Sequence, residues 1–350
     1  MDKKKFIDGI RLTGFPLENA TVEKLVSARW SIISNKYYLD SDNPQPREID
    51  ILAYKVTNIQ GVEVVTALII SCKKSERNIW AFLTRKADLK NPNIDFNPVH
   101  FRTDYVPLSF YLRQERWRDE YVKQAVDYGV AEVFSVPDYQ VFALQQMLKG
   151  VGNDAKSEGK PNNDSDMFGS IQSLMKAQFH EESLTSERKG PRPRVYQFNL
   201  ISLADTEFLR LEFTGPDIQA IEADHVHYVT SYLFNKRNTF SRVTFVRSDA
   251  FDKLLEDYGR LHVANTKIVD QRIHDFFHLI LTDAENHPKR RALLPQFRER
   301  LKNEIWFYTL NIDENVKFEE AWLSWSDEKK LIEIHLPAAG GVRISVFKAG

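Results

Sequence analysis

The sequence predicts an α/β fold in which a mixed β-sheet is flanked by helices. A helix, a β-hairpin, a strand, a further helix and a further strand follow one another along the chain, an order typical of such folds. Hydrophobic residues make up 42% of the 350 positions, enough to bury a sizeable core. A chain of this length predicts two domains or one domain with a large extension. We expect one domain over residues 1–262, with an insertion near 86–166, and a C-terminal α+β extension over 263–350.

A helix is expected across 14–34, because Pro16 suits a first turn and apolar residues recur at helical spacing up to Trp30. The hairpin that follows joins two segments rich in β-branched residues, 47–53 and 67–75, through turn residues at 58–61.

If this turn centres on Gln60 and Gly61, Asp50 falls opposite Ser71, and Ser71 shares a face with Lys73. The hairpin then holds a carboxylate beside a lysine at one end, which is unusual because each charge loses water there. The simplest interpretation of Asp50 is an ion pair with Arg47 or Lys73.

The rest of the chain alternates further helical and extended patterns. Strands are expected at 78–83, 195–203, 208–213 and 242–246, and residues 226–233 fit either a strand or a helix. Helices are expected at 113–128, 138–149, 167–181, 249–258, 266–284 and 289–306, and short strands around Trp322 and Trp325 in 307–347.

Composition excludes several classes of function. The formal net charge of −1 carries no global signal for nucleic acid, although a local basic cleft is allowed. Cys72 is the only cysteine, which rules out an intrachain disulfide and a multi-cysteine zinc site and favours a reducing, cytoplasmic compartment. The sequence contains no run of about 18 apolar residues and no glycine-rich phosphate loop. A signal peptide, a membrane span and autonomous NTP hydrolysis are therefore not expected.

Three short motifs stand in a suggestive order: Gly14-Phe15-Pro16-Leu17-Glu18, Arg47-Glu48-Ile49-Asp50 and Ser71-Cys72-Lys73. They resemble the PD-(D/E)XK, or restriction-endonuclease-like, nuclease superfamily. Its pattern is a helix with a glutamate, a strand with an aspartate, and a next strand with (Asp or Glu)-x-Lys. The strand around Trp80 and the helix at 171–177 resemble later parts of that core. The resemblance covers roughly 14–260 and implies a restriction-endonuclease-like core for the 1–262 domain.

The resemblance implies a nuclease that hydrolyses phosphodiester bonds with Mg²⁺ or Mn²⁺. Its substrate would be nucleic acid, with DNA favoured over RNA, and its setting would be defence or DNA repair. Asp50 would bind the ion with help from Glu18, and Lys73 would orient water or neutralise charge. Ser71 or the backbone carbonyl of Cys72 would complete the metal shell, and Gln172 would reach the site from the crossing helix. Ser71 departs from the pattern because a hydroxyl is a weaker Mg²⁺ ligand than a carboxylate. Glu18 or Glu48 could compensate.

The alternative function is a catalytically inactive module of the same fold that binds nucleic acid or a protein partner. Candidate phosphate contacts are Lys176, which shares a helix face with Gln172, Arg188 and Lys189 in a connector, and Arg290 and Arg291 in a basic patch. A solvated surface is the alternative for each of them. The sequence leaves a homodimer open.

Three other features have simpler interpretations. The Cys72 thiol is expected to be an unreactive group in the hydrophobic core. Metal binding is not favoured at either histidine pair with metal-like spacing, because His225/His227 lack a third ligand and His274/His278 lack the glutamate of a zinc-hydrolase helix.

Overall fold

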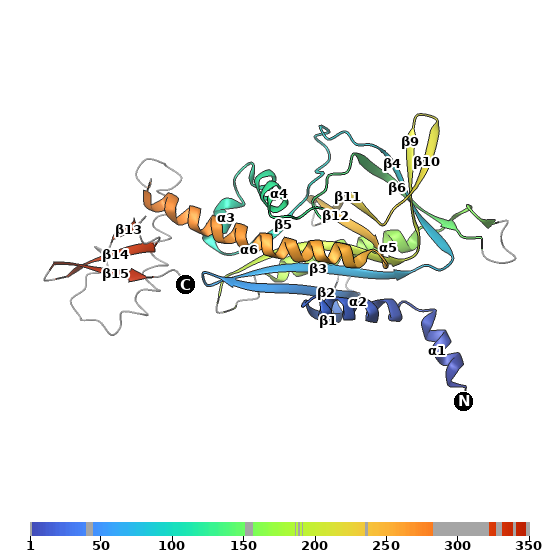
Figure 1. Cartoon of the computed structure of the whole chain (residues 1–350), viewed down its shortest axis with the longest axis horizontal. Coiled ribbons are helices and arrows are strands. Elements are labelled where there is room, and N and C mark those ends of the chain that lie inside the picture. Colours follow the sequence, from blue (N-terminus) through green and yellow to red (C-terminus); the bar gives the residue numbers. More distant parts are fainter. Residues whose placement is uncertain are drawn as a thin grey trace.

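The computed structural model describes residues 2–39, 45–150, 157–185, 187, 190, 192–234, 237–282, 322–326, 331–338 and 341–347. Within them the chain is mixed α/β, and a mixed sheet is flanked by helices, as the sequence predicts (Figure 1). The described strands form three sheets, of seven, five and three strands. The molecule is elongated, and the three-stranded sheet lies at the far end of the last helix.

The central sheet has the order β1–β2–β3–β8–β12–β11, and β5 also pairs with β8. The first three strands form an antiparallel meander, whereas β8 runs parallel to β3 and β12 runs parallel to β8. The strands are β1 (Ser31–Leu39), β2 (Pro46–Ile59), β3 (Val62–Lys74), β5 (His100–Thr103), β8 (Arg194–Asp205), β11 (His225–Phe234) and β12 (Arg237–Arg247).

The β2–β3 hairpin confirms the predicted turn and register. Gln60 and Gly61 both have positive φ, 50° and 78°, as a two-residue hairpin turn of type I′ requires. The ladder runs from Ile59 opposite Val62 to Ile51 opposite Ile70. Asp50 and Ser71 therefore stand one step beyond the last pair.

Helices cover both faces of the central sheet. One core lies between the sheet and α2, α4 and α6; the other lies between the sheet, α5 and the five-stranded sheet. The helices are α1 (Lys3–Arg11), α2 (Phe15–Ser27), α3 (Val106–Tyr111), α4 (Trp117–Asp127), α5 (Ser165–Leu184) and α6 (Phe251–Thr282). The second sheet has the order β10–β9–β4–β6–β7.

The second sheet consists of β4 (Asn78–Lys86), β6 (Tyr139–Leu148), β7 (Pro161–Asn162), β9 (Phe208–Thr214) and β10 (Asp217–Glu222). The third consists of β13 (Trp322–Ser326), β14 (Leu331–Ala338) and β15 (Gly341–Phe347). Short strands at both tryptophans are thereby confirmed, and residues 226–233 form a strand. The helix expected at 289–306 lies outside the described residues.

Three expectations about helices were wrong. The helix expected across 14–34 ends at Ser27, because residues 31–34 pair with β2 as the start of β1. Residues 138–149 form the strand β6, because β4 offers an antiparallel partner and both Val141 and Leu144 pack into the second core. The helices expected at 249–258 and 266–284 are one helix, α6, since buried residues such as Leu261 and Ile268 continue its apolar stripe. The expected boundary at residue 262 therefore falls inside α6.

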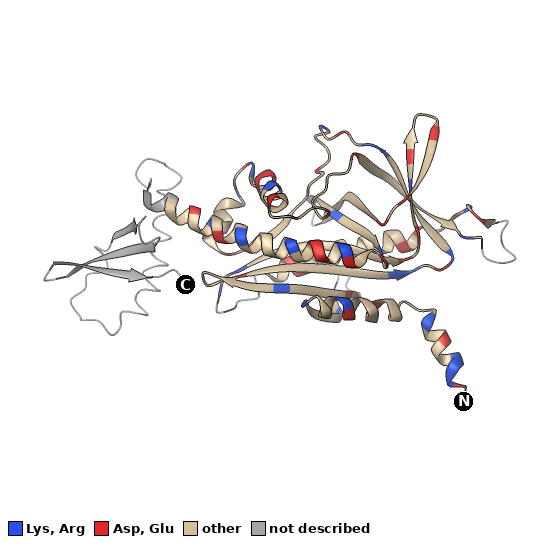
Figure 2. Ribbon diagram, in the orientation of Figure 1, with Lys and Arg blue, Asp and Glu red and all other residues tan. Residues whose placement is uncertain are grey.

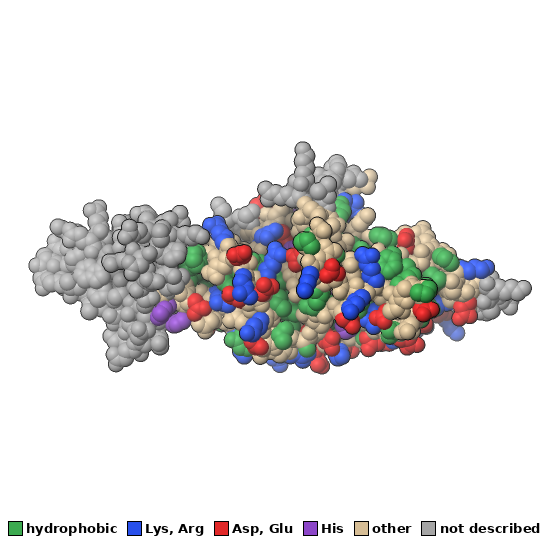
Figure 3. Space-filling view, turned by 90° about the horizontal axis from the view of Figure 1, so that it is seen from above, with side chains coloured by type: hydrophobic (Ala, Val, Ile, Leu, Met, Phe, Trp, Pro, Cys, Tyr) green, Lys and Arg blue, Asp and Glu red, His purple; other side chains and the backbone are tan. Residues whose placement is uncertain are grey.

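Charged residues on the surface are mixed in sign. Acidic and basic positions alternate along α6 (Figure 2). On the face shown in Figure 3, the coloured Lys and Arg side chains are interspersed with Asp and Glu and with small apolar patches. That face, as far as its residues are described, shows no single-sign field of the kind that steers a polyanion.

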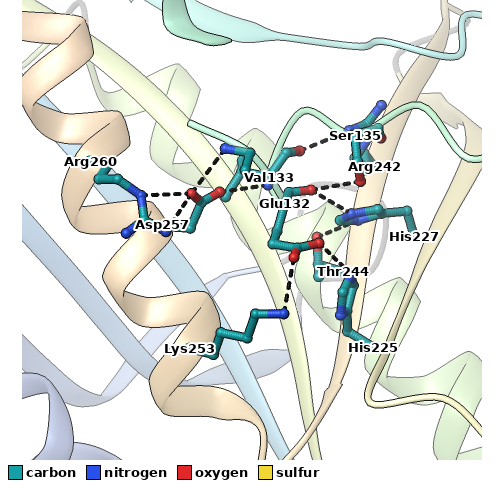
Figure 4. A network of polar contacts seen from close by, with 11 residues as sticks. Glu132, Val133, Ser135, His225, His227, Arg242, Thr244, Lys253, Asp257 and Arg260 are labelled. Carbon is teal, nitrogen blue, oxygen red and sulfur yellow. Dashed lines mark hydrogen bonds and ion pairs between the residues drawn. The ribbon is translucent and has the colours of Figure 1, made fainter. Parts of the chain in front are cut away.

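A buried polar network fixes the loop at residues 130–135 to α6 and to the β11–β12 pair (Figure 4). The Asp257 carboxylate is fully buried and accepts hydrogen bonds from the backbone N–H groups of Ala131 and Val133, at 3.0 and 2.8 Å. His227 lies 2.9 Å from the Glu132 carbonyl oxygen, and the Arg242 guanidinium donates to the Val133 carbonyl at 2.8 Å.

This network explains the first histidine pair as a structural one. Burial lowers the pKa of His227 well below its usual value, so the ring stays neutral between Thr244 and the Glu132 carbonyl. His225 lies 3.5 Å from the Glu132 carboxylate instead of facing a shared centre with His227.

Candidate functional site

At Asp50, the regular strand pairing of β2 is interrupted toward β1 and ends toward β3. Toward β1, the pairs Ser34–Ile51 and Lys36–Ile49 flank Asp50, while Asn35 opposite it has a φ of 52°. Toward β3, pairing stops at Ile51. The strands therefore separate at Asp50, and its side chain has room to turn toward β3.

The Asp50 carboxylate accepts the hydrogen bond that a backbone carbonyl of β2 would accept if the two strands were still paired. Its Oδ2 accepts a hydrogen bond from the Cys72 backbone N–H at 2.7 Å. This contact satisfies the amide that β2 no longer reaches and fixes the orientation of the carboxylate. Within the described part of the chain, Oδ1 of Asp50 makes no hydrogen bond and is available to a ligand.

Helix α2 places a second carboxylate beside Asp50. Pro16 lies at the start of this helix and Glu18 in its first turn, where the helix dipole favours an acid. Burial raises the pKa of Glu18, and the negative charges of Asp50 and then Glu48 raise it further, whereas Lys73 lowers it. Three carboxylates and one lysine, drawn from α2, β2 and β3, therefore lie within electrostatic range of one another at this end of the sheet.

Lys73 is half-buried at the end of β3. Its positive charge lowers the pKa of Glu18. Its ammonium nevertheless forms no hydrogen bond or ion pair with any residue that the structure describes. The expected ion pair with Asp50 is therefore not formed. The lysine can approach a bound anion without first breaking a contact.

Ser71 and Cys72 face opposite sides of the sheet. Cys72 is 4% exposed and contacts the Thr21 hydroxyl of α2; burial first, and then the Asp50 charge, raise the pKa of its thiol. The thiol is thus protonated and inert. Ser71 is also 4% exposed and stands beside Ser202 of β8, whose hydroxyl oxygen accepts from Ser170 of α5 at 2.7 Å.

Glu48 belongs to the same acidic group. Its carboxylate accepts hydrogen bonds from the Asn35 side-chain amide at 2.7 Å and from the Tyr37 hydroxyl at 3.3 Å. Its negative charge raises the pKa of Tyr37. Sequence reasoning did not find Asn35, Tyr37 or Thr21; Thr21 could have been found, because it lies three residues after Glu18 on one helix face.

None of the other predicted site residues that the structure describes forms a contact with this group. Gln172 is exposed on α5, and its side chain makes no hydrogen bond within the described residues. Lys176 is half-buried one turn further along the same helix. Arg188, Lys189, Arg290 and Arg291 lie outside the described residues. A role for any of them in nucleic-acid binding stays a prediction.

The donors at the end of the β2–β3 hairpin are oxygens, the ligand type that Mg²⁺ and Mn²⁺ prefer. Among the described residues, no three His, Cys, Asp or Glu side chains lie close enough together to hold a metal ion. Mg²⁺ commonly takes one or two carboxylates and fills its shell with water and substrate phosphate. Asp50 and Glu18 fit that smaller requirement.

Comparison of the chain with protein-family models, curated proteins and solved structures finds no match. Within the described part of the chain, the helices lack any apolar stretch long enough to cross a membrane.

Proposed function

We propose that this protein is a metal-dependent nuclease with a restriction-endonuclease-like core. The observation that carries the proposal is the convergence of Glu18, Asp50 and Lys73 at the point where β2 and β3 separate. The order of elements supports it as well. Helix α2, the β2–β3 hairpin, α5 and the strand β8 follow one another as the resemblance predicts.

Asp50 and Glu18 are the residues that would hold Mg²⁺ or Mn²⁺. When bound, the ion supplies positive charge that stabilises the phosphodiester transition state and lowers the pKa of a bound water. The Cys72 N–H keeps one oxygen of Asp50 occupied and directs the other toward the ligand. In an extended strand the N–H and C=O of one residue point to the same edge, so the Cys72 carbonyl is expected beside Asp50 as well.

Lys73 and Glu18 have separate roles in this proposal. The unpaired ammonium of Lys73 would contact the scissile phosphate and neutralise charge as it develops. Glu18 would share the ion with Asp50, because a cation between the two carboxylates offsets the burial and the like charge that raise the pKa of Glu18. Glu48 lies close enough to influence Glu18 and would provide the acid that Ser71 does not.

A cleavage assay tests the proposal. Plasmid and single-stranded substrates are incubated with Mg²⁺ or Mn²⁺ and with wild type, Asp50→Asn or Lys73→Ala. Asparagine can still accept from the Cys72 N–H, so Asp50→Asn removes the charge with little effect on folding. Each change should lower the cleavage rate about 100-fold or more, roughly 3 kcal/mol of transition-state stabilisation. Glu23→Gln, an exposed acid on the same helix, is the matched control. Cleavage that survives both substitutions would refute this site.

Ser71 favours a second candidate function, a catalytically inactive module that binds nucleic acid or a protein partner. The buried hydroxyl on the α5 face cannot supply the missing charge. If the wild type retains nucleic acid but cuts nothing with either metal, this second function replaces the first.

A further inference from the structure

A cavity of about 560 Å³ opens far from the Asp50 group, beneath β5 and α3. It lies where β5 pairs with the beginning of β8, with Thr103 opposite Val195. Lys73 stands beside Ala204 near the other end of β8. Nine residues of extended strand separate the two places, about 30 Å. The cavity is therefore a separate site from the candidate nuclease centre.

Three arginines line this cavity: Arg102 from β5, Arg113 from the segment between α3 and α4, and Arg118 from the first turn of α4. Arg118 is paired with Asp95 and lies with its guanidinium 5.6 Å from the centre of the Trp117 ring. Arg113 is exposed, and its side chain forms no hydrogen bond or ion pair with the residues that the structure describes. Arg118 is offset by Asp95 and Arg102 by the buried Glu182, so the exposed guanidinium of Arg113 is the cavity charge that no acid of the described residues offsets.

Arg102 is fixed from behind by a buried acid. It forms an ion pair with Glu182 of α5, which is only 4% exposed at its side chain. Gln178 donates to the same carboxylate at 2.8 Å, and His100 Nδ1 lies 3.2 Å from it. Burial alone would raise the pKa of Glu182, but the hydrogen bond and charge of His100 and the charge of Arg102 hold it below the usual value. A buried carboxylate thus orients Arg102 at the cavity wall.

His100 also lines the cavity and is held on both sides of its ring. Its Nε2 lies 3.0 Å from the Phe240 carbonyl oxygen while Nδ1 faces Glu182. Asn238 and Thr239 also line the cavity, and their amide and hydroxyl can bond a sugar. Aromatic side chains from Phe101, Trp117 and Phe240 complete the lining.

From this combination we propose that the cavity binds a nucleoside phosphate. Arginine forks match phosphate oxygens in two-point contacts, and aromatic side chains stack on bases with little regard to sequence. The volume is within the range that small-molecule sites occupy. The site does not depend on nuclease activity, because it shares none of the residues of the Asp50 group.

Calorimetric titration of the full chain tests the proposal, in EDTA so that no metal mediates binding. The probes are ADP, inorganic pyrophosphate, adenosine and a single-stranded oligonucleotide. ADP and pyrophosphate should bind with a dissociation constant below about 1 mM, and adenosine should bind far more weakly, because it offers the arginines no charge.

Arg113→Ala is the decisive variant, since this side chain holds no structural contact within the described residues. It should weaken ADP binding about tenfold or more. Arg116→Ala is the control and should leave binding unchanged, because Arg116 is exposed, lies three residues after Arg113 and does not line the cavity. Equal ADP affinity in the two variants, or no ADP binding, would overturn the proposal. So would an oligonucleotide that needs Arg113 while ADP does not bind, because the cavity would then belong to a nucleic-acid surface.

Discussion

The Cys72 backbone N–H donates to the Asp50 carboxylate at 2.7 Å, at the first position where β2 no longer pairs with β3. One side chain therefore closes the hairpin and faces the candidate site. Substitutions at Asp50 should separate these two roles.

Asp50→Ala leaves the Cys72 amide without its acceptor, whereas Asp50→Asn can keep one. We expect Asp50→Ala to lower the free energy of unfolding by about 1–3 kcal/mol more than Asp50→Asn does. Urea unfolding followed by far-UV circular dichroism measures the difference. Equal stability of the two variants would mean that the hydrogen bond contributes nothing to the fold.

Ser71→Asp restores an acid at the position that departs from the nuclease pattern. Because Ser71 is 4% exposed, a carboxylate there should destabilise the metal-free protein by about 1–3 kcal/mol. Mg²⁺ should recover part of that loss and increase cleavage. The melting temperature with and without Mg²⁺ checks this, and Ser71→Asn, which adds size without charge, should show no Mg²⁺ response. A Ser71→Asp protein indifferent to Mg²⁺ would count against a metal site at this strand end.

His262 of α6 should make stability depend on pH. Its ring lies between Thr57 and Thr66 hydroxyls at 2.8 and 3.0 Å, and burial, aided by the Lys55 charge, lowers its pKa to about 4. The unfolded chain then binds a proton more readily than the folded one, so stability is complete above pH 6.5 and falls toward pH 4.

This group alone should cost about 1–2 kcal/mol on going from pH 7 to pH 5. Denaturant unfolding at both pH values measures the change in wild type and in His262→Gln, which should lose that part of the pH dependence. His278→Gln, at an exposed position of the same helix, should retain it. A wild-type slope preserved in His262→Gln would show that other groups cause it.

Asp257 should be among the acids most important for stability. Its buried carboxylate accepts two backbone N–H groups and pairs with Arg260 at 2.9 Å, so Asp257→Ala leaves buried donors unsatisfied. We expect a loss of about 3–5 kcal/mol. Asp252→Ala, on the same helix, removes only a surface pair with Lys24 and should cost no more than about 1 kcal/mol. Thermal or urea unfolding distinguishes the two, and similar losses would mean that the loop at 130–135 is held by other contacts.

The hairpin and its register were predictable because the information is local. The two-residue turn at Gln60 and Gly61 sets which residues of the two strands face one another. Counting outward from this turn places Asp50 opposite Ser71, as the observed register does. Residues 139–148 were not predictable in this way. Their sequence suggests a helix, but pairing with the distant strand β4 makes them a strand.

The proposed nucleotide cavity is a harder case. Arg102, Arg113 and Glu182 come from an insertion and from the end of a helix, and only the folded chain brings them together. Glu18 was found from sequence through a resemblance. Its neighbours Asn35 and Tyr37 were not, because their roles depend on the bend in β1 opposite Asp50.

Helix α5 extends from the strand end beside Ser71 to the arginine-lined cavity. Near its beginning Ser170 bonds Ser202, the neighbour of Ser71, and near its end Glu182 holds Arg102. A ligand that moves α5 at either end moves one rigid body shared by both. Thermodynamic reciprocity then fixes the consequence: whatever factor a nucleotide applies to metal affinity at Asp50, the metal must apply to nucleotide affinity at Arg102.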